Sequence, residues 1–110
     1  MTVDDALLDR LRTLVANWPG VSEKRMFGGI CLMLNGHMLV GLGSHDALMV
    51  RVGPDQYENA LNQPFAREMD FTGRPMRGFV YVDTEGLEED DALSRWLERA
   101  SKFVLSLPPK

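Results

Sequence analysis

Cysteine and histidine are the residues of this sequence best suited to covalent or metal chemistry. The chain has one cysteine, Cys31, followed by His37 and by the adjacent pair His45 and Asp46. A nucleophilic cysteine needs a base or a cation to hold its thiolate. Alternation along the predicted strands places His37 on the opposite face of the sheet from Cys31. We therefore expect Cys31 to be a buried, unreactive thiol and predict no catalytic residue.

The same four residues are also the candidate ligands for a metal ion. Their spacing matches no recognised zinc pattern, and metal ligands must converge on one point. His45 and Asp46 also suit a turn, where such residues are common for backbone reasons. The sequence therefore predicts no metal and no cofactor.

A pair of glycines, Gly28 and Gly29, precedes the apolar stretch "ICLMLNGHMLVGL". A phosphate-binding loop requires a longer glycine, lysine and hydroxyl pattern between a strand and a helix, and this stretch has neither. Glycine also permits backbone conformations and close approaches that other residues do not. We interpret the pair as a backbone feature at the entrance to a strand.

Charged residues restrict the class of partner. The chain has 12 basic and 16 acidic residues, a net charge of -4, which argues against binding nucleic acid alone. The acidic run over residues 88–91 suits the positive end of a helix dipole better than a metal site. Six cations between the two long predicted helices form a candidate anion patch, with a scattered solvated surface as the alternative. They are Lys24, Arg25, Arg51, Arg67, Arg74 and Arg77.

Hydrophobic spacing predicts the elements that position these residues. Apolar residues at helical spacing predict a first helix that ends at Pro19-Gly20 and a last helix over residues 85–107. Asn35-Gly36 predicts a tight hairpin, because both central residues of a type I′ turn need positive φ.

Three further elements complete the predicted fold. A strand is expected at residues 47–52, a short helix after Gly53-Pro54, and a second hairpin over residues 67–71 and 77–83. The fold class is α+β with two layers. An antiparallel sheet of about five strands is expected in α-β-β-β-α-β-β-α order, with the long first and last helices packed on one face.

Length and composition bound the domain and its location. The 110 residues fit one domain over 1–110. A single cysteine excludes an internal disulfide, which suits a cytoplasmic protein. The acidic N-terminus does not resemble a signal peptide, and no run approaches the ~20 apolar residues of a membrane span.

Both faces of the predicted sheet are apolar, and such sheets need both faces covered. A two-residue turn pairs Met33 with Met38 and Cys31 with Val40, and leaves a face rich in flexible methionine. This face is a candidate interface for a homodimer or another protein, unless the middle helix or a loop covers it. Its residues are Cys31, Met33, Met38, Val40 and Met49.

Two short motifs precede strands of this predicted sheet: residues 25–29 come before its first strand and residues 73–76 before its aromatic strand. The strand "LMVRV" and a terminal helix after an acidic run accompany them. With these features the chain resembles the N-terminal domain of the TfoX/Sxy family of bacterial competence regulators, from about Val15 to Leu107. The motif residues are Arg25, Met26, Phe27, Gly28, Gly29, Gly73, Arg74, Pro75 and Met76.

The resemblance implies a two-layer α+β domain with a regulatory rather than a catalytic role. Full-length members carry a second, helix-hairpin-helix domain and act with the cyclic-AMP receptor protein to switch on DNA-uptake genes. We expect this chain to be a stand-alone regulatory module that binds a protein partner. By analogy with the family, we expect that partner to belong to the transcription machinery. The alternatives are a nucleic-acid-associated factor that uses a local arginine patch and a small-ligand-binding domain near Cys31 and the glycines.

Overall fold

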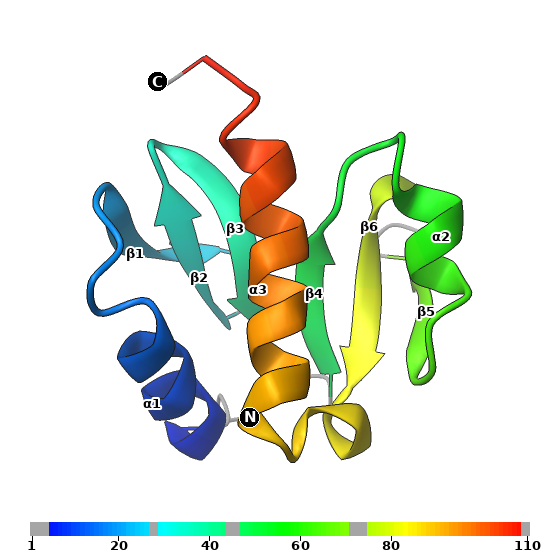
Figure 1. Ribbon diagram of the computed structural model, residues 1–110, viewed down its shortest axis with the longest axis horizontal. Helices are drawn as coiled ribbons and strands as arrows, with labels where there is room; N and C mark the ends of the chain where they lie inside the picture. The colour runs from blue at the N-terminus through cyan, green and yellow to red at the C-terminus, as the bar shows by residue number, and fades with distance from the viewer. Residues whose placement is uncertain (1–4, 27–28, 44–46, 71–74, 109–110) are drawn as a thin grey trace.

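The computed structural model describes residues 5–26, 29–43, 47–70 and 75–108. Its elements are α1 (Asp5–Leu14), β1 (Val21–Met26), β2 (Gly29–Leu34), β3 (His37–Leu42), β4 (Ala47–Arg51), α2 (Tyr57–Leu61), β5 (Ala66–Asp70), β6 (Pro75–Asp83), the 3-10 helix η1 (Thr84–Leu87) and α3 (Asp90–Val104). The strands form one antiparallel sheet in the order β1-β2-β3-β4-β6-β5 (Figure 1). The α+β class and the antiparallel sheet are confirmed, but the expected number of strands is too small by one.

The strand missing from the prediction is β1. It pairs with β2 along its whole length, from Val21 opposite Leu34 to Met26 opposite Gly29. The side chains of residues 22–25 are all exposed, so β1 has no apolar alternation that could indicate a strand. Its charges suit an edge strand, because they discourage pairing with a further strand.

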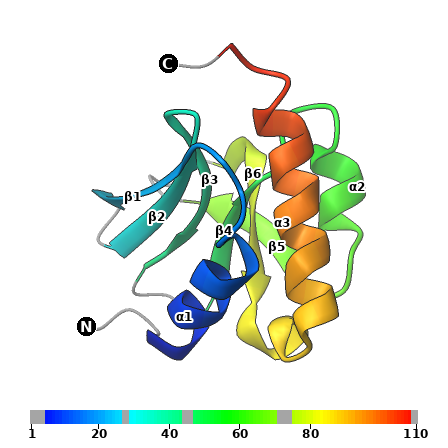
Figure 2. The same cartoon turned by 60° about the vertical axis from the view of Figure 1, so that its left-hand side comes forward.

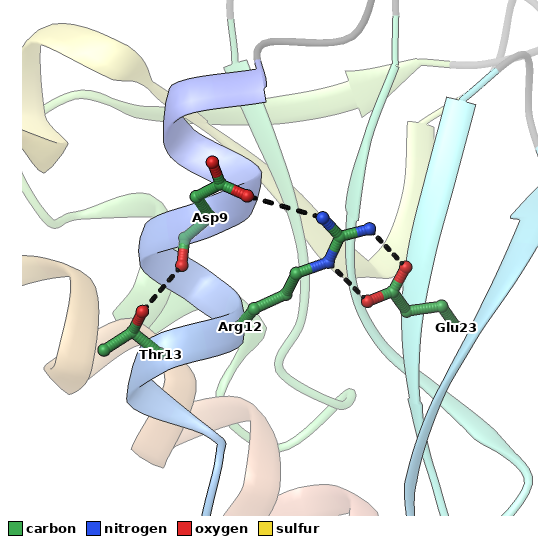
Figure 3. Close-up of polar contacts among 4 residues, drawn as sticks. All are labelled: Asp9, Arg12, Thr13 and Glu23. Atoms are coloured by element: carbon green, nitrogen blue, oxygen red, sulfur yellow. Dashed lines mark hydrogen bonds and ion pairs between the residues drawn. The ribbon is translucent and has the colours of Figure 1, made fainter.

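One ion pair joins this edge strand to α1. Arg12 donates from Nε and Nη2 to the two carboxylate oxygens of Glu23 on β1, at 2.7 and 2.8 Å (Figure 3). Arg12 also contacts Asp9 one turn earlier at 3.4 Å, and the Thr13 hydroxyl donates to the Asp9 carbonyl oxygen. The two-point contact links α1 to β1, and because both side chains are exposed it contributes little to stability.

The β2–β3 hairpin has the predicted turn but a different register. Asn35 and Gly36 have φ of 54° and 85°, as a type I′ turn requires, and Met33 pairs with Met38 as expected. The register then shifts, so Leu32 pairs with Val40 instead of Leu39. The extra residue at position 39 reverses the alternation beyond it. Placing Val40 on the methionine face was therefore wrong.

Three helices cover one face of the sheet and enclose the helix-side core. In Figure 1, α3 lies across the middle of the sheet, and Figure 2 shows α1 and α2 on either side of it. Helix α1 ends at Leu14, earlier than predicted, although Val15 and Trp18 still pack in this core. The strands contribute Leu32, Leu34, Leu39, Val40, Leu42, Leu48, Val50, Val80 and Val82 to this core, and Val52 follows directly after β4.

The acidic run lies at the start of α3, as predicted, but the helix is shorter than the predicted residues 85–107, because Thr84–Leu87 form the separate 3-10 helix η1. Glu89 is the N-cap residue, and Asp90 and Asp91 lie in the first turn. Arg10 of α1 donates to the Asp90 carboxylate at 2.9 Å and to the Glu88 carbonyl oxygen at 3.2 Å. The run therefore also joins the two helices. Among the described residues, no helix is long and apolar enough to cross a bilayer.

Candidate functional site

Cys31 lies in the interior of the protein. Its exposed fraction is 0%, and burial raises the pKa of its thiol, which favours the protonated form. His37 instead contacts Pro108. The His37 Nε2 lies 2.6 Å from the Pro108 carbonyl oxygen and joins the β2–β3 turn to the C-terminal segment. The predicted burial of Cys31 is confirmed.

The methionine face is a second core within the single chain, which we call the Met-side cluster. Met33, Met38 and Met49 are only 8%, 6% and 3% exposed. These side chains are therefore too buried to contact a partner. The prediction that this face is an interface was wrong. The cluster comprises Cys31, Met33, Met38, Ala47, Met49, Met69 and Tyr81, with Phe79 packed against it.

The absence of a side chain at Gly41 helps to explain this burial. Gly41 pairs with Cys31 across β2 and β3. A Cβ at Gly41 would lie 2.7 Å from Met49 Cε and 2.9 Å from Cys31 Sγ, closer than carbon and sulfur atoms can approach. The sulfur-containing side chains therefore occupy the space over the glycine, which sequence alternation alone could not show.

The two family motifs lie at strand connections. Residues 25–29 span the connection from β1 to β2, and residues 73–76 reach the start of β6. A Cβ on Gly29 would overlap the Leu42 carbonyl oxygen, so this glycine permits a close approach of two backbones. Phe27, Gly28, Gly73 and Arg74 lie outside the described residues.

The predicted anion patch separates into two groups on the described strands. Lys24 and Arg25 lie on β1, whereas Arg67 lies on β5 at the other edge of the sheet. Arg67 forms an ion pair with Asp83 at 2.8 Å and lies over the Tyr81 ring. Lys24 and Arg25 therefore lie at the opposite edge of the sheet from Arg67, and the three cations do not share one edge.

The other described cations of the predicted patch lie against aromatic rings. The Arg51 guanidinium carbon is 5.6 Å from the Phe79 ring centre and 5.5 Å from that of Phe103, and burial lowers its pKa. Arg77 lies 5.7 Å from the centre of the Tyr57 ring. These cations contribute to packing on β4 and β6. Binding of an anion by them stays a prediction.

A pocket beside α3 was missed by the sequence reasoning. It has a volume of about 240 Å³, and arginine supplies all of its charged lining. We call it the arginine pocket. Its lining comes from the segment after α2, from η1 and from one face of α3. These residues are Gln63, Pro64, Phe65, Gly86, Ala92, Arg95, Trp96 and Arg99.

The α3 residues of the arginine pocket follow from helical spacing. Arg95 and Arg99 lie one turn apart, and Trp96 turns inward, 7% exposed. Arg99 donates from Nη1 to Asn59 Oδ1 of α2 at 2.9 Å and lies 5.2 Å from the centre of the Trp96 ring. The sequence "RWLER" carries this spacing, but the candidate cations predicted from the sequence do not include its arginines.

The described residues contain no group of side chains that could hold a metal ion. Within them, no group of three or more His, Cys, Asp or Glu side chains is arranged to hold an ion. Cys31 is buried, His37 contacts Pro108, and His45 and Asp46 lie outside the described residues.

Family comparison agrees with the motifs and with the element order. The chain matches the TfoX N-terminal domain over residues 13–104. It belongs to this family, which is associated with competence regulation. A search of curated proteins gives no significant match.

Proposed function

We propose that the protein is a non-enzymatic regulatory module that acts in the cytoplasm by binding another protein. The observation that supports this most is an exposed aromatic side chain beside a charged pocket. Phe65 is 48% exposed and forms part of the lining of the arginine pocket. Aromatic residues and arginine are enriched where proteins bind one another.

The environment of Cys31 also supports a binding role over nucleophilic catalysis. A cysteine nucleophile requires a thiolate, and burial of Cys31 favours the neutral thiol. The Met-side cluster is buried, so we do not propose it as a dimer interface. Association through another surface remains compatible with the regulatory role.

Affinity purification from the native cell tests this proposal. The tagged chain, expressed at its native level and briefly cross-linked, should enrich one protein in near-equal amount over a tag-only control. Quantitative mass spectrometry of the recovered material measures that ratio. Failure to enrich any protein over the tag-only control would contradict the proposal.

A further inference from the structure

Three described arginines are paired with a carboxylate, whereas the two arginines of α3 are not. Arg10, Arg12 and Arg67 each form an ion pair with an aspartate or glutamate. Arg95 and Arg99 form none with the described residues. Their positions one turn apart place two like charges side by side, which opposes helix formation. A negatively charged ligand would relieve this repulsion.

The pocket between these arginines and Phe65 has a mixed character. Arg95 and Arg99 supply two positive charges, while Pro64, Phe65 and Trp96 supply apolar walls. The whole chain has a net charge of -4, so the local sign is opposite to that of the protein. This combination suits a carboxylate that stands next to an apolar side chain.

Phe65 is held in position by its backbone. It has φ of 67°, a left-handed conformation that an aromatic residue rarely adopts. Its carbonyl oxygen accepts a hydrogen bond from the Asp83 N–H at 2.9 Å, and a Cβ on Gly86 would lie 2.6 Å from its ring. The backbone therefore fixes a half-exposed ring at the mouth of the pocket.

The pocket continues along α3 into a wider depression of about 520 Å³, because Arg95 and Arg99 line both. Lys102 and Phe103 extend the cationic and apolar lining, and Asp55 and Glu98 add two negative charges. Across from α3, this depression is lined by Val52, Asp55 and Gln56, which precede α2. The lining follows α3 from Ala92 to Ser106, about four helical turns, which suits a peptide segment better than a single side chain.

We propose that this groove binds an acidic peptide segment of a partner protein. Its carboxylates contact Arg95 and Arg99, and an aromatic or aliphatic side chain packs against Phe65 and Trp96. The proposal rests on the protein-binding function above and adds the chemistry of the partner.

The direct test uses a fluorescein-labelled peptide with central Phe and Leu flanked by Asp and Glu. Fluorescence anisotropy at about 0.15 M salt, where distant surface charges are screened, should show saturable binding to the wild-type chain. R95E/R99E should weaken binding by about tenfold or more, because it removes two charge-assisted contacts. R95M/R99M, which keeps the alkyl stems and the helix propensity, should also weaken it. F65N, which tolerates positive φ, should weaken it without a change of charge.

The matched control is K24E/R25E, which changes the net charge by the same amount as R95E/R99E. Its two residues are exposed and lie on β1, an edge strand of the sheet. It should bind within about twofold of the wild type. The proposal is overturned if R95E/R99E and K24E/R25E weaken binding equally. It is also overturned if the wild type shows no saturable binding, or if duplex DNA displaces the peptide.

Co-purification separates this inference from the proposed function. If R95E/R99E loses the recovered protein while K24E/R25E retains it, both stand. If both variants retain it, the module function stands and the groove assignment fails. If the wild type recovers no protein, the module function fails, and the anisotropy result alone decides whether the groove binds acidic peptides.

Discussion

Cys31 and Gly41 face each other on β2 and β3, and the cysteine sulfur fills space that a side chain at position 41 would need. Substitution G41V should therefore overpack the Met-side cluster and lower the free energy of unfolding by about 1–3 kcal/mol. Urea denaturation followed by circular dichroism measures the change. G41A should cost less, because Met49 Cε is the flexible end of a side chain. A G41V variant as stable as the wild type would contradict this packing.

The thiol of Cys31 should be protected in the folded protein. Burial raises its pKa, so the thiolate fraction at neutral pH is smaller than for a free cysteine. Reaction with a disulfide reagent should be slow in buffer and fast in urea. Rapid stoichiometric labelling of the folded chain at neutral pH would show that Cys31 is accessible and reactive.

Met49 should behave as a core residue instead of an interface residue. It is 3% exposed, so M49A should lower the free energy of unfolding by about 2–5 kcal/mol. The exposed control K24A should change it by less than about 0.5 kcal/mol. Unaltered stability of M49A, together with a change in sedimentation, would instead indicate an interface between copies of the chain.

The Arg12–Glu23 pair should make stability depend on pH in one direction. The hydrogen bond from Arg12 holds the pKa of Glu23 below its ordinary value of 4.5. The resulting stabilisation is fully present above that value and is lost as pH falls through the lower pKa of the folded state. E23Q should therefore lower Tm slightly near neutral pH, and the difference should shrink in acid.

Thermal unfolding of the wild type and E23Q over a series of pH values measures this difference. S22A, one position away on the same exposed strand, serves as the control for a change that removes no charge. A difference between the wild type and E23Q that grows as pH falls would contradict the assigned pair.

The apolar elements could be predicted from the sequence, and the features that depend on neighbouring strands could not. The Asn35-Gly36 turn and the α3 stripe each carry a local signal, and the structure has both. β1 has exposed polar side chains and becomes a strand only because β2 offers backbone partners. The register shift before Met33 likewise follows from how two strands meet, so the side chain of Val40 was assigned to the wrong face.

The candidate sites show the same limit. Burial of the Met-side cluster depends on Met69 and Tyr81 from β5 and β6, far along the chain from Met33. The arginine pocket similarly needs Phe65 to lie beside a helix that begins much later in the sequence. Helical spacing placed Arg95 and Arg99 together, but only the fold placed an exposed ring next to them.

The central claim is that this protein acts by binding another protein, and calorimetric titration with the purified partner recovered from the native cell tests it most directly. The account predicts saturable binding with a defined stoichiometry and a negative heat-capacity change from apolar burial. Absence of saturable binding between the two purified proteins would contradict it.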